Sequence, residues 1–93
     1  MILKIITPDQ NEIDQESVKY INLRLSDGYP ISIYPGHTQL IALIAEGNIK
    51  LSADHQEKEF SVSEGLVTID NDMVTCFVNW AMPFNNEKND RKQ

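Results

Sequence analysis

With 93 residues, of which 41 % are hydrophobic, the chain can build one domain around one core and has no room for a second domain of useful size. Eight basic residues against fourteen acidic ones give a formal charge of −6, which argues against nucleic-acid binding because Lys and Arg must neutralise the phosphates. The single cysteine excludes an internal disulfide, and the longest apolar run, Leu40 to Ala45, is too short to span a bilayer.

The first half of the chain consists of short runs with strand character, separated by turn residues about every eight to twelve positions. Between Ser17 and Leu25, the side chains of Ile21, Leu23 and Leu25 share one face, which is the period-two pattern of a half-buried strand. Turn signals end the runs at Pro8-Asp9, Asp27-Gly28 and Pro35-Gly36. Strands are therefore predicted over 3–7, 17–25, 29–34 and 40–45; periodicity alone would also allow a helix over 40–45, but its length and the following Gly47 favour a strand.

The second half of the chain continues the same pattern. Ile49 and Leu51 alternate with polar residues toward a tip at 54–58, and Phe60 and Val62 alternate after it, so the segment is predicted to be a hairpin. The turn 70–72 separates two further strands, 67–69 and 74–78. The sequence therefore predicts an all-β fold, a two-sheet β-sandwich of about eight to ten short strands over residues 1–84, followed by a polar, disordered tail over 85–93.

Isolated glycines in such a fold mark turns, bulges or close approaches of the backbone. Gly47 and Gly65 each directly precede an apolar run. We expect a positive φ at both residues, which would redirect the chain into the next strand.

No pattern of residues points to catalysis or metal binding. His37 and His55 lie far apart, and the sequence has no C-x-x-C or H-x-x-x-H motif. Ser63-Glu64-Gly65 lacks the G-x-S-x-G frame, and Cys76 falls on the buried face of its strand, where a thiol is inert. We expect no enzyme activity, no cofactor and no metal site.

Several ordered motifs resemble the epsilon subunit of the F-type ATP synthase. The run Ile33-Tyr34-Pro35-Gly36-His37 is similar to that family's I-[YL]-P-x-H turn, and it is followed, as in the family, by an apolar segment and then by Gly47-Asn48-Ile49. Further matches to the family's later strands are Phe60, Ser63, Gly65, Leu66, Val67 and Val74-Thr75. The resemblance extends from residue 2 to about residue 82.

The sequence also departs from the family pattern. Tyr29-Pro30-Ile31-Ser32 replaces much of a Gly-x-x-Gly segment, Glu46 stands where the family often has Pro, and Glu64 replaces one of two paired glycines. The Glu64-Gly65 pair resembles epsilon subunits of the alternate, sodium-type branch. The family's C-terminal pair of helices has no counterpart in these 93 residues.

The resemblance implies a non-catalytic subunit of the central stalk, which couples rotation of the gamma subunit to the membrane-embedded c-ring. It places Thr7 and Ala42 near gamma. The positions that it turns toward the c-ring are Asp27, Tyr29, Tyr34, Pro35, Gly36 and His37. A different interpretation of the turn puts Tyr34 in the core and leaves only His37 exposed.

The resemblance also implies a location. We expect a soluble, cytoplasmic chain that is held at the inner face of the cell membrane only through the complex. The alternative function is a free-standing β-sandwich module that binds a protein or a glycan, which would require exposed aromatic residues clustered on one face.

Overall fold

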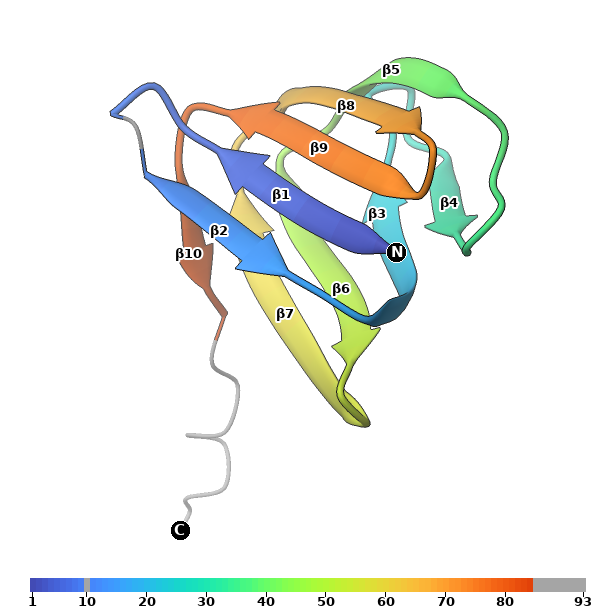
Figure 1. Cartoon of the computed structure of the whole chain (residues 1–93). Helices are drawn as coiled ribbons and strands as arrows, with labels where there is room; N and C mark the ends of the chain where they lie inside the picture. The colour runs from blue at the N-terminus through green and yellow to red at the C-terminus, as the bar shows by residue number, and fades with distance from the viewer. Residues whose placement is uncertain (10, 85–93) are drawn as a thin grey trace, which may run out of the picture.

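The strand runs of the sequence form two five-stranded sheets that pack face to face (Figure 1). The computed structural model describes residues 1–9 and 11–84, and these contain ten strands and no helix. The prediction of an all-β, two-sheet β-sandwich is therefore confirmed. The predicted polar tail, 85–93, lies outside the described residues.

The first sheet has the order β2-β1-β9-β8-β5. Its strands are β1 (Ile2–Ile6), β2 (Glu12–Gln15), β5 (Leu40–Ile44), β8 (Gly65–Asp70) and β9 (Met73–Val78). The second sheet has the order β10-β7-β6-β3-β4. Its strands are β3 (Val18–Arg24), β4 (Pro30–Ile33), β6 (Gly47–Ala53), β7 (Gln56–Val62) and β10 (Ala81–Pro83). Among the strand pairs of residues 1–9 and 11–84, β1 and β9 are parallel and all the others are antiparallel.

One apolar core fills the space between the two sheets, because every second residue of the long strands points inward. The first sheet contributes Leu3, Ile5, Val67, Val74 and Cys76, and the second contributes Ile21, Ile33, Ile49 and Leu51, all of them no more than 1 % exposed. Burying each of the Leu, Ile and Val side chains among them stabilises the fold by about 1.5–3 kcal/mol relative to leaving it in water.

Two tight hairpins shape the ends of the sheets. Asp54-His55 joins β6 to β7 with φ values of 55° and 63°, and Asn71-Asp72 joins β8 to β9 with φ values of 51° and 65°. Two consecutive positive φ angles in a two-residue loop define a type I′ turn, whose twist matches that of the flanking strands. The predicted polar tip at 54–58 is therefore too long, since Gln56, Glu57 and Lys58 pair with β6 as part of β7.

The sequence did not single out β2 and β10, which are edge strands of their sheets. β2 carries one apolar residue, Ile13, and β10 contains Pro83. Neither segment shows an alternating pattern, because an edge strand is held mainly by backbone hydrogen bonds to one neighbour.

Candidate functional site

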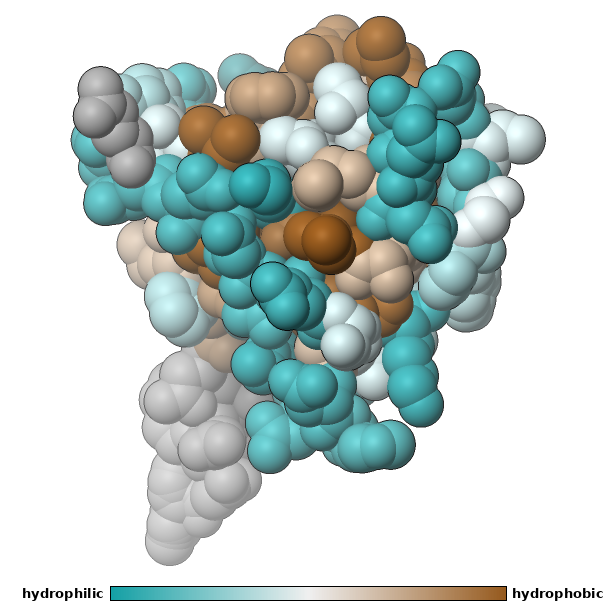
Figure 2. All heavy atoms as spheres, in the orientation of Figure 1, coloured by the Kyte–Doolittle hydropathy of each residue, from teal (hydrophilic) through white to brown (hydrophobic). Residues whose placement is uncertain are grey.

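An apolar row crosses the outer face of the first sheet. The strand register places Leu43 of β5 beside Leu66 of β8, Leu66 beside Phe77 of β9, and Phe77 beside Ile6 of β1. We call these four residues the apolar row. Leu43 is 60 % exposed and Phe77 is 44 % exposed, although all four point away from the core. Figure 2 shows apolar atoms at the upper border of the molecule, over β5 and β8.

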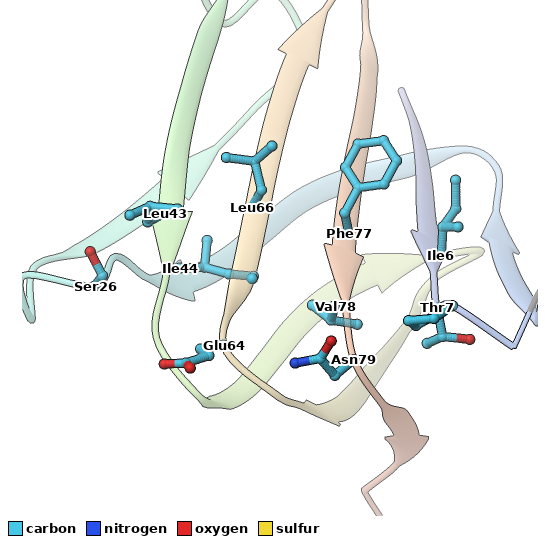
Figure 3. Close-up of a pocket in the computed structure, with 12 residues that line it drawn as sticks. Ile6, Thr7, Ser26, Leu43, Ile44, Glu64, Leu66, Phe77, Val78 and Asn79 are labelled. Atoms are coloured by element: carbon cyan, nitrogen blue, oxygen red, sulfur yellow. The ribbon is translucent and has the colours of Figure 1, made fainter.

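The apolar row forms one side of an open hollow of about 650 Å³. Figure 3 shows the four side chains next to one another, with polar residues below them where the strands end. The rest of the lining consists of two core residues, Ile44 and Val78, and of the polar and turn residues Thr7, Pro8, Ser26, Glu64, Gly65 and Asn79. The surface therefore has an apolar centre with a polar border on one side, which is the usual layout of a protein-binding patch.

Gly65 allows β8 to approach β9 at the base of the hollow. A Cβ atom added at this position would lie 2.1 Å from the carbonyl oxygen of Phe77 and 2.8 Å from Cγ1 of Val78. The expected positive φ at Gly65 is wrong, since Gly65 is not among the glycines with positive φ; the residue is needed for the close contact of the two backbones. The expected positive φ at Gly47 is confirmed, with a value of 158°.

A buried hydroxyl fixes the polar border. Ser63 is 5 % exposed, and its Oγ accepts a hydrogen bond from the backbone N–H of Asn79 at 2.7 Å and donates one to the carbonyl of Glu64 at 2.9 Å. Asn79 and Glu64 belong to two different crossings between the sheets. The hydroxyl thus holds both crossings together and keeps the two polar side chains at the border of the hollow.

A second exposed feature is the 34–39 loop, which carries the chain from β4 of the second sheet to β5 of the first. The N–H of His37 donates to the carbonyl of Tyr34 at 3.1 Å, with Pro35 and Gly36 (φ 86°) between them, as in a type II turn. Tyr34 is 57 % exposed, and its ring centroid lies 6.4 Å from that of Tyr20. Tyr34 is therefore a surface residue outside the core.

Hydrogen bonds attach this loop to the turn between β8 and β9. The backbone N–H of Gly36 donates to Oδ1 of Asp72 at 3.1 Å, and the side-chain amide of Gln39 donates to Oδ1 of Asp70 at 2.6 Å. Both carboxylates are far from the loop in sequence. From the sequence the turn 70–72 is predictable only as a chain reversal, because nothing in a turn pattern shows which distant segment its side chains meet.

The six residues that the resemblance turned toward the c-ring form two groups. Tyr34 to His37 lie at the end of β4, whereas Asp27 and Tyr29 lie before its start, so Tyr29 and Tyr34 are about 16 Å apart along the strand. The Asp27 turn lies against the end of β5, where the N–H of Ser26 donates to the carbonyl of Leu43 at 2.9 Å. This turn is thus a neighbour of the hollow.

The two residues expected near gamma, Thr7 and Ala42, lie in different environments. Thr7 lines the hollow beside the apolar row, but Ala42 points inward and packs against the core. Its neighbours Ile41 (73 % exposed) and Leu43 point outward from the same strand. Any protein that docks on this face therefore meets the two flanking side chains before it meets Ala42.

Charges lie at the opposite edge of the same face. Nζ of Lys4 pairs with a carboxylate oxygen of Glu12 at 3.1 Å. This contact raises the pKa of Lys4 and lowers that of Glu12, while a hydrogen bond with Glu12 raises the pKa of Asp14. Within residues 1–9 and 11–84, no group of three or more His, Cys, Asp and Glu side chains is arranged to hold a metal ion.

Comparisons with known proteins agree on one family. The family described as "ATP synthase, Delta/Epsilon chain, beta-sandwich domain" matches residues 1–84. An ATP synthase epsilon chain from Sulfurovum sp. is 32 % identical over 97 % of this chain and 70 % of its own length. One from Staphylococcus saprophyticus is 31 % identical over 89 % of this chain and 61 % of its own length, so the chain spans about two thirds of these relatives.

Solved structures show the same fold. A chain in the mitochondrial ATP synthase of Euglena gracilis, described as OSCP/F1/c-ring, superimposes with a TM-score of 0.72 at 19 % identity, over 92 % of this chain and 56 % of that chain. One from the central stalk and c-ring of the Tetrahymena thermophila enzyme has a TM-score of 0.73 at 13 % identity, over 100 % and 73 %. Since the family covers residues 1–84 and two relatives exceed 30 % identity, the chain belongs to the ATP synthase delta/epsilon-chain β-sandwich family.

Proposed function

We propose that the chain is a non-catalytic central-stalk subunit of a proton- or sodium-translocating F-type ATP synthase, where it couples rotation of gamma to the c-ring. Membership of the family supports this proposal, as do relatives that are named ATP synthase epsilon chain. In such a complex the chain is peripheral on the inner face of the cell membrane. The described part of the chain contains no helix long and apolar enough to cross a bilayer.

The observation that carries the proposal is the apolar row. Its four side chains are adjacent on four neighbouring strands, and they contribute nothing to the core of the isolated chain. Covering such a surface releases about 25 cal/mol for each Å² of apolar area removed from water. We assign this face to gamma, with Thr7 at its border and with Ile41 and Leu43 in place of Ala42 as the direct contacts.

The 34–39 loop supplies the contact with the c-ring. Its type II turn presents Tyr34 and His37 to solvent, and a tyrosine offers both apolar area and a hydroxyl to a partner. Asp27 and Tyr29, at the other end of β4, form a separate exposed turn, and they contact the c-ring only if its polar loops reach both ends of the strand.

Co-expression with gamma and c subunits tests both assignments. Leu43→Ser should reduce recovery of the chain with gamma, whereas Met82→Ser, which alters a similarly exposed apolar residue (54 %) on the second sheet, should leave it intact. Equal recovery of both variants would refute the gamma face. Replacing Tyr34 and His37 together with Ala should weaken association with the c-ring and leave gamma binding unchanged.

The same double variant separates a contact role from a structural one. Because Tyr34 is exposed, the thermal unfolding midpoint of the double variant should stay within a few degrees of the parent value. A large drop in that midpoint would mean that the Tyr34–Tyr20 contact stabilises the sheet.

A further inference from the structure

We propose that Asp70 and Asp72 are positioning residues that hold the 34–39 loop in the shape that meets the c-ring, and that the β8–β9 hairpin thereby connects the gamma face to the c-ring contact. This inference rests on the proposed function. Neither aspartate belongs to the motifs that carry the family resemblance, and neither needs to touch a partner.

The loop is held mainly from the first sheet. Gly36 donates its N–H to the carboxylate of Asp72, 36 residues away, and Gln39 donates its side-chain amide to Asp70, 31 residues away. The two bonds fix opposite ends of the segment that follows Pro35. Without them, the local restraints are the hydrogen bond from the N–H of His37 to Tyr34 and the contact of His37 Nδ1 with the carbonyl of Thr38 at 2.8 Å, and neither orients the turn relative to the sheets.

The backbone of Asp72 is itself fixed. It occupies the second position of the type I′ turn with φ of 65°, and its carbonyl accepts the N–H of Ile2 at 2.9 Å. The turn is therefore bound to β1 as well as to its own hairpin. Because the backbone of Asp72 is fixed in this way, its carboxylate loses little conformational entropy when it accepts the hydrogen bond from the Gly36 amide.

The same hairpin carries the centre of the apolar row. Leu66 belongs to β8 and Phe77 to β9, and the register pairs them directly. From Leu66 to Asp70 the strand covers about 13 Å. One continuous antiparallel pair thus holds gamma at one end and the c-ring loop at the other, so a displacement imposed at the row reaches the loop through a single rigid element.

Two variants of Asp72 test the anchor. Asp72→Gly removes the carboxylate and suits the positive φ, so the hairpin should be retained. Asp72→Asn keeps an acceptor oxygen and also tolerates this conformation, so it serves as the rescue. In the isolated chain, amide hydrogen exchange followed by NMR should show faster exchange at Gly36, by about fivefold, in Asp72→Gly and near-parent exchange in Asp72→Asn.

The second measurement uses the complex with gamma and the c-ring. Asp72→Gly should weaken c-ring association severalfold and leave gamma binding at the parent level, and Asp72→Asn should restore c-ring association. Gln39→Ala together with Asp70→Ala should be no worse than either change alone, because they remove the same bond.

The outcomes separate this inference from the proposed function. Unchanged exchange at Gly36 in Asp72→Gly would overturn the anchor, whatever the partners do. If replacing Tyr34 and His37 weakens c-ring association but Asp72→Gly does not, the positioning role is wrong and the c-ring contact stands. If the Tyr34 and His37 variant has no effect on the c-ring, the assignment of the loop fails, and the inference that depends on it fails at that step.

Discussion

Cys76 shows how completely the core excludes water. The side chain is 0 % exposed, and burial raises the pKa of its thiol from 9.0 to about 12. In the folded chain such a thiol stays protonated near neutral pH. The alternation of Val74, Cys76 and Val78 predicted a buried, unreactive cysteine, and the raised pKa of its thiol agrees with this prediction.

This shift predicts how stability depends on pH. Below pH 9 the thiol is neutral in both states and contributes no pH dependence; between about pH 9 and 12 the unfolded chain ionises while the folded chain does not. The free energy of unfolding should therefore fall as the pH rises through this window, by about 1.4 kcal/mol per pH unit. Urea denaturation of the parent and of Cys76→Ala at several pH values checks this prediction. Plotted against pH, the free energies of unfolding of the two proteins should run parallel below pH 9 and converge above it. Curves that stay parallel up to pH 11 would contradict the prediction.

Replacing Gly65 should destabilise the fold, because its position leaves no space for a side chain. Gly65→Ala places a methyl group 2.1 Å from a backbone oxygen, so β8 must move away from β9, and the fold should lose about 1–3 kcal/mol. The adjacent, exposed Glu64→Ala is the matched control and should change stability by less than about 0.5 kcal/mol. Chemical denaturation of both variants measures the difference. Equal midpoints would mean that the two strands can separate freely at this point.

At the scale of the elements, the type I′ turn at Asp54-His55 predicts a stabilising change. Both residues hold positive φ, which costs an ordinary residue about 1–2 kcal/mol and costs glycine nothing. Replacing the pair by Asn-Gly, the preferred sequence of this turn, should raise the free energy of unfolding by about 1 kcal/mol. His55→Ala keeps the strain and should give no gain. A loss of stability in the Asn-Gly variant would mean that the side chains of the turn contribute more than its backbone.

Elements with one buried face were predictable, and those without one were not. The alternation in 17–25 predicted β3, and that in 74–78 predicted β9, because the core imposes period two on their residues. β2 and β10 were not predicted, because backbone pairing alone does not require a particular pattern of side chains. β5 was ambiguous for the opposite reason: Leu40 to Ala45 is apolar on both faces, although only one of them meets the core.

The second face of β5 is part of the candidate site, and the sequence could not show it. Leu43, Leu66, Phe77 and Ile6 lie in four separate stretches, and only the register of β5, β8, β9 and β1 makes them one row. The resemblance supplied Thr7 at the border of this surface but named Ala42, the inward residue, next to the exposed Leu43. Because successive side chains of a strand point to opposite faces, an assignment that is wrong by one residue names a core residue in place of a surface residue.

At the scale of the whole molecule, the two proposed contacts lie at opposite ends of the β8–β9 hairpin, one on its strands and the other on the loop bonded to its turn, and they differ in chemistry. The gamma face is apolar at its centre, and the chain as a whole carries a charge of −6. Association driven by apolar burial has a negative heat-capacity change and depends weakly on salt, because screening acts on charges and leaves apolar contacts unaffected. The chemistry of the row therefore predicts the thermodynamics of gamma binding.

We expect titration calorimetry of this chain with gamma to give a negative heat-capacity change, with a Kd that changes less than about threefold between 0.1 and 0.5 M salt. The double variant Leu43→Ser, Phe77→Ser should raise the Kd at least about tenfold, since it removes the two most exposed side chains of the row. Its circular dichroism should match that of the parent, because neither residue belongs to the core. A Kd that rises steeply with salt would mean instead that gamma recognises the acidic surface around the row.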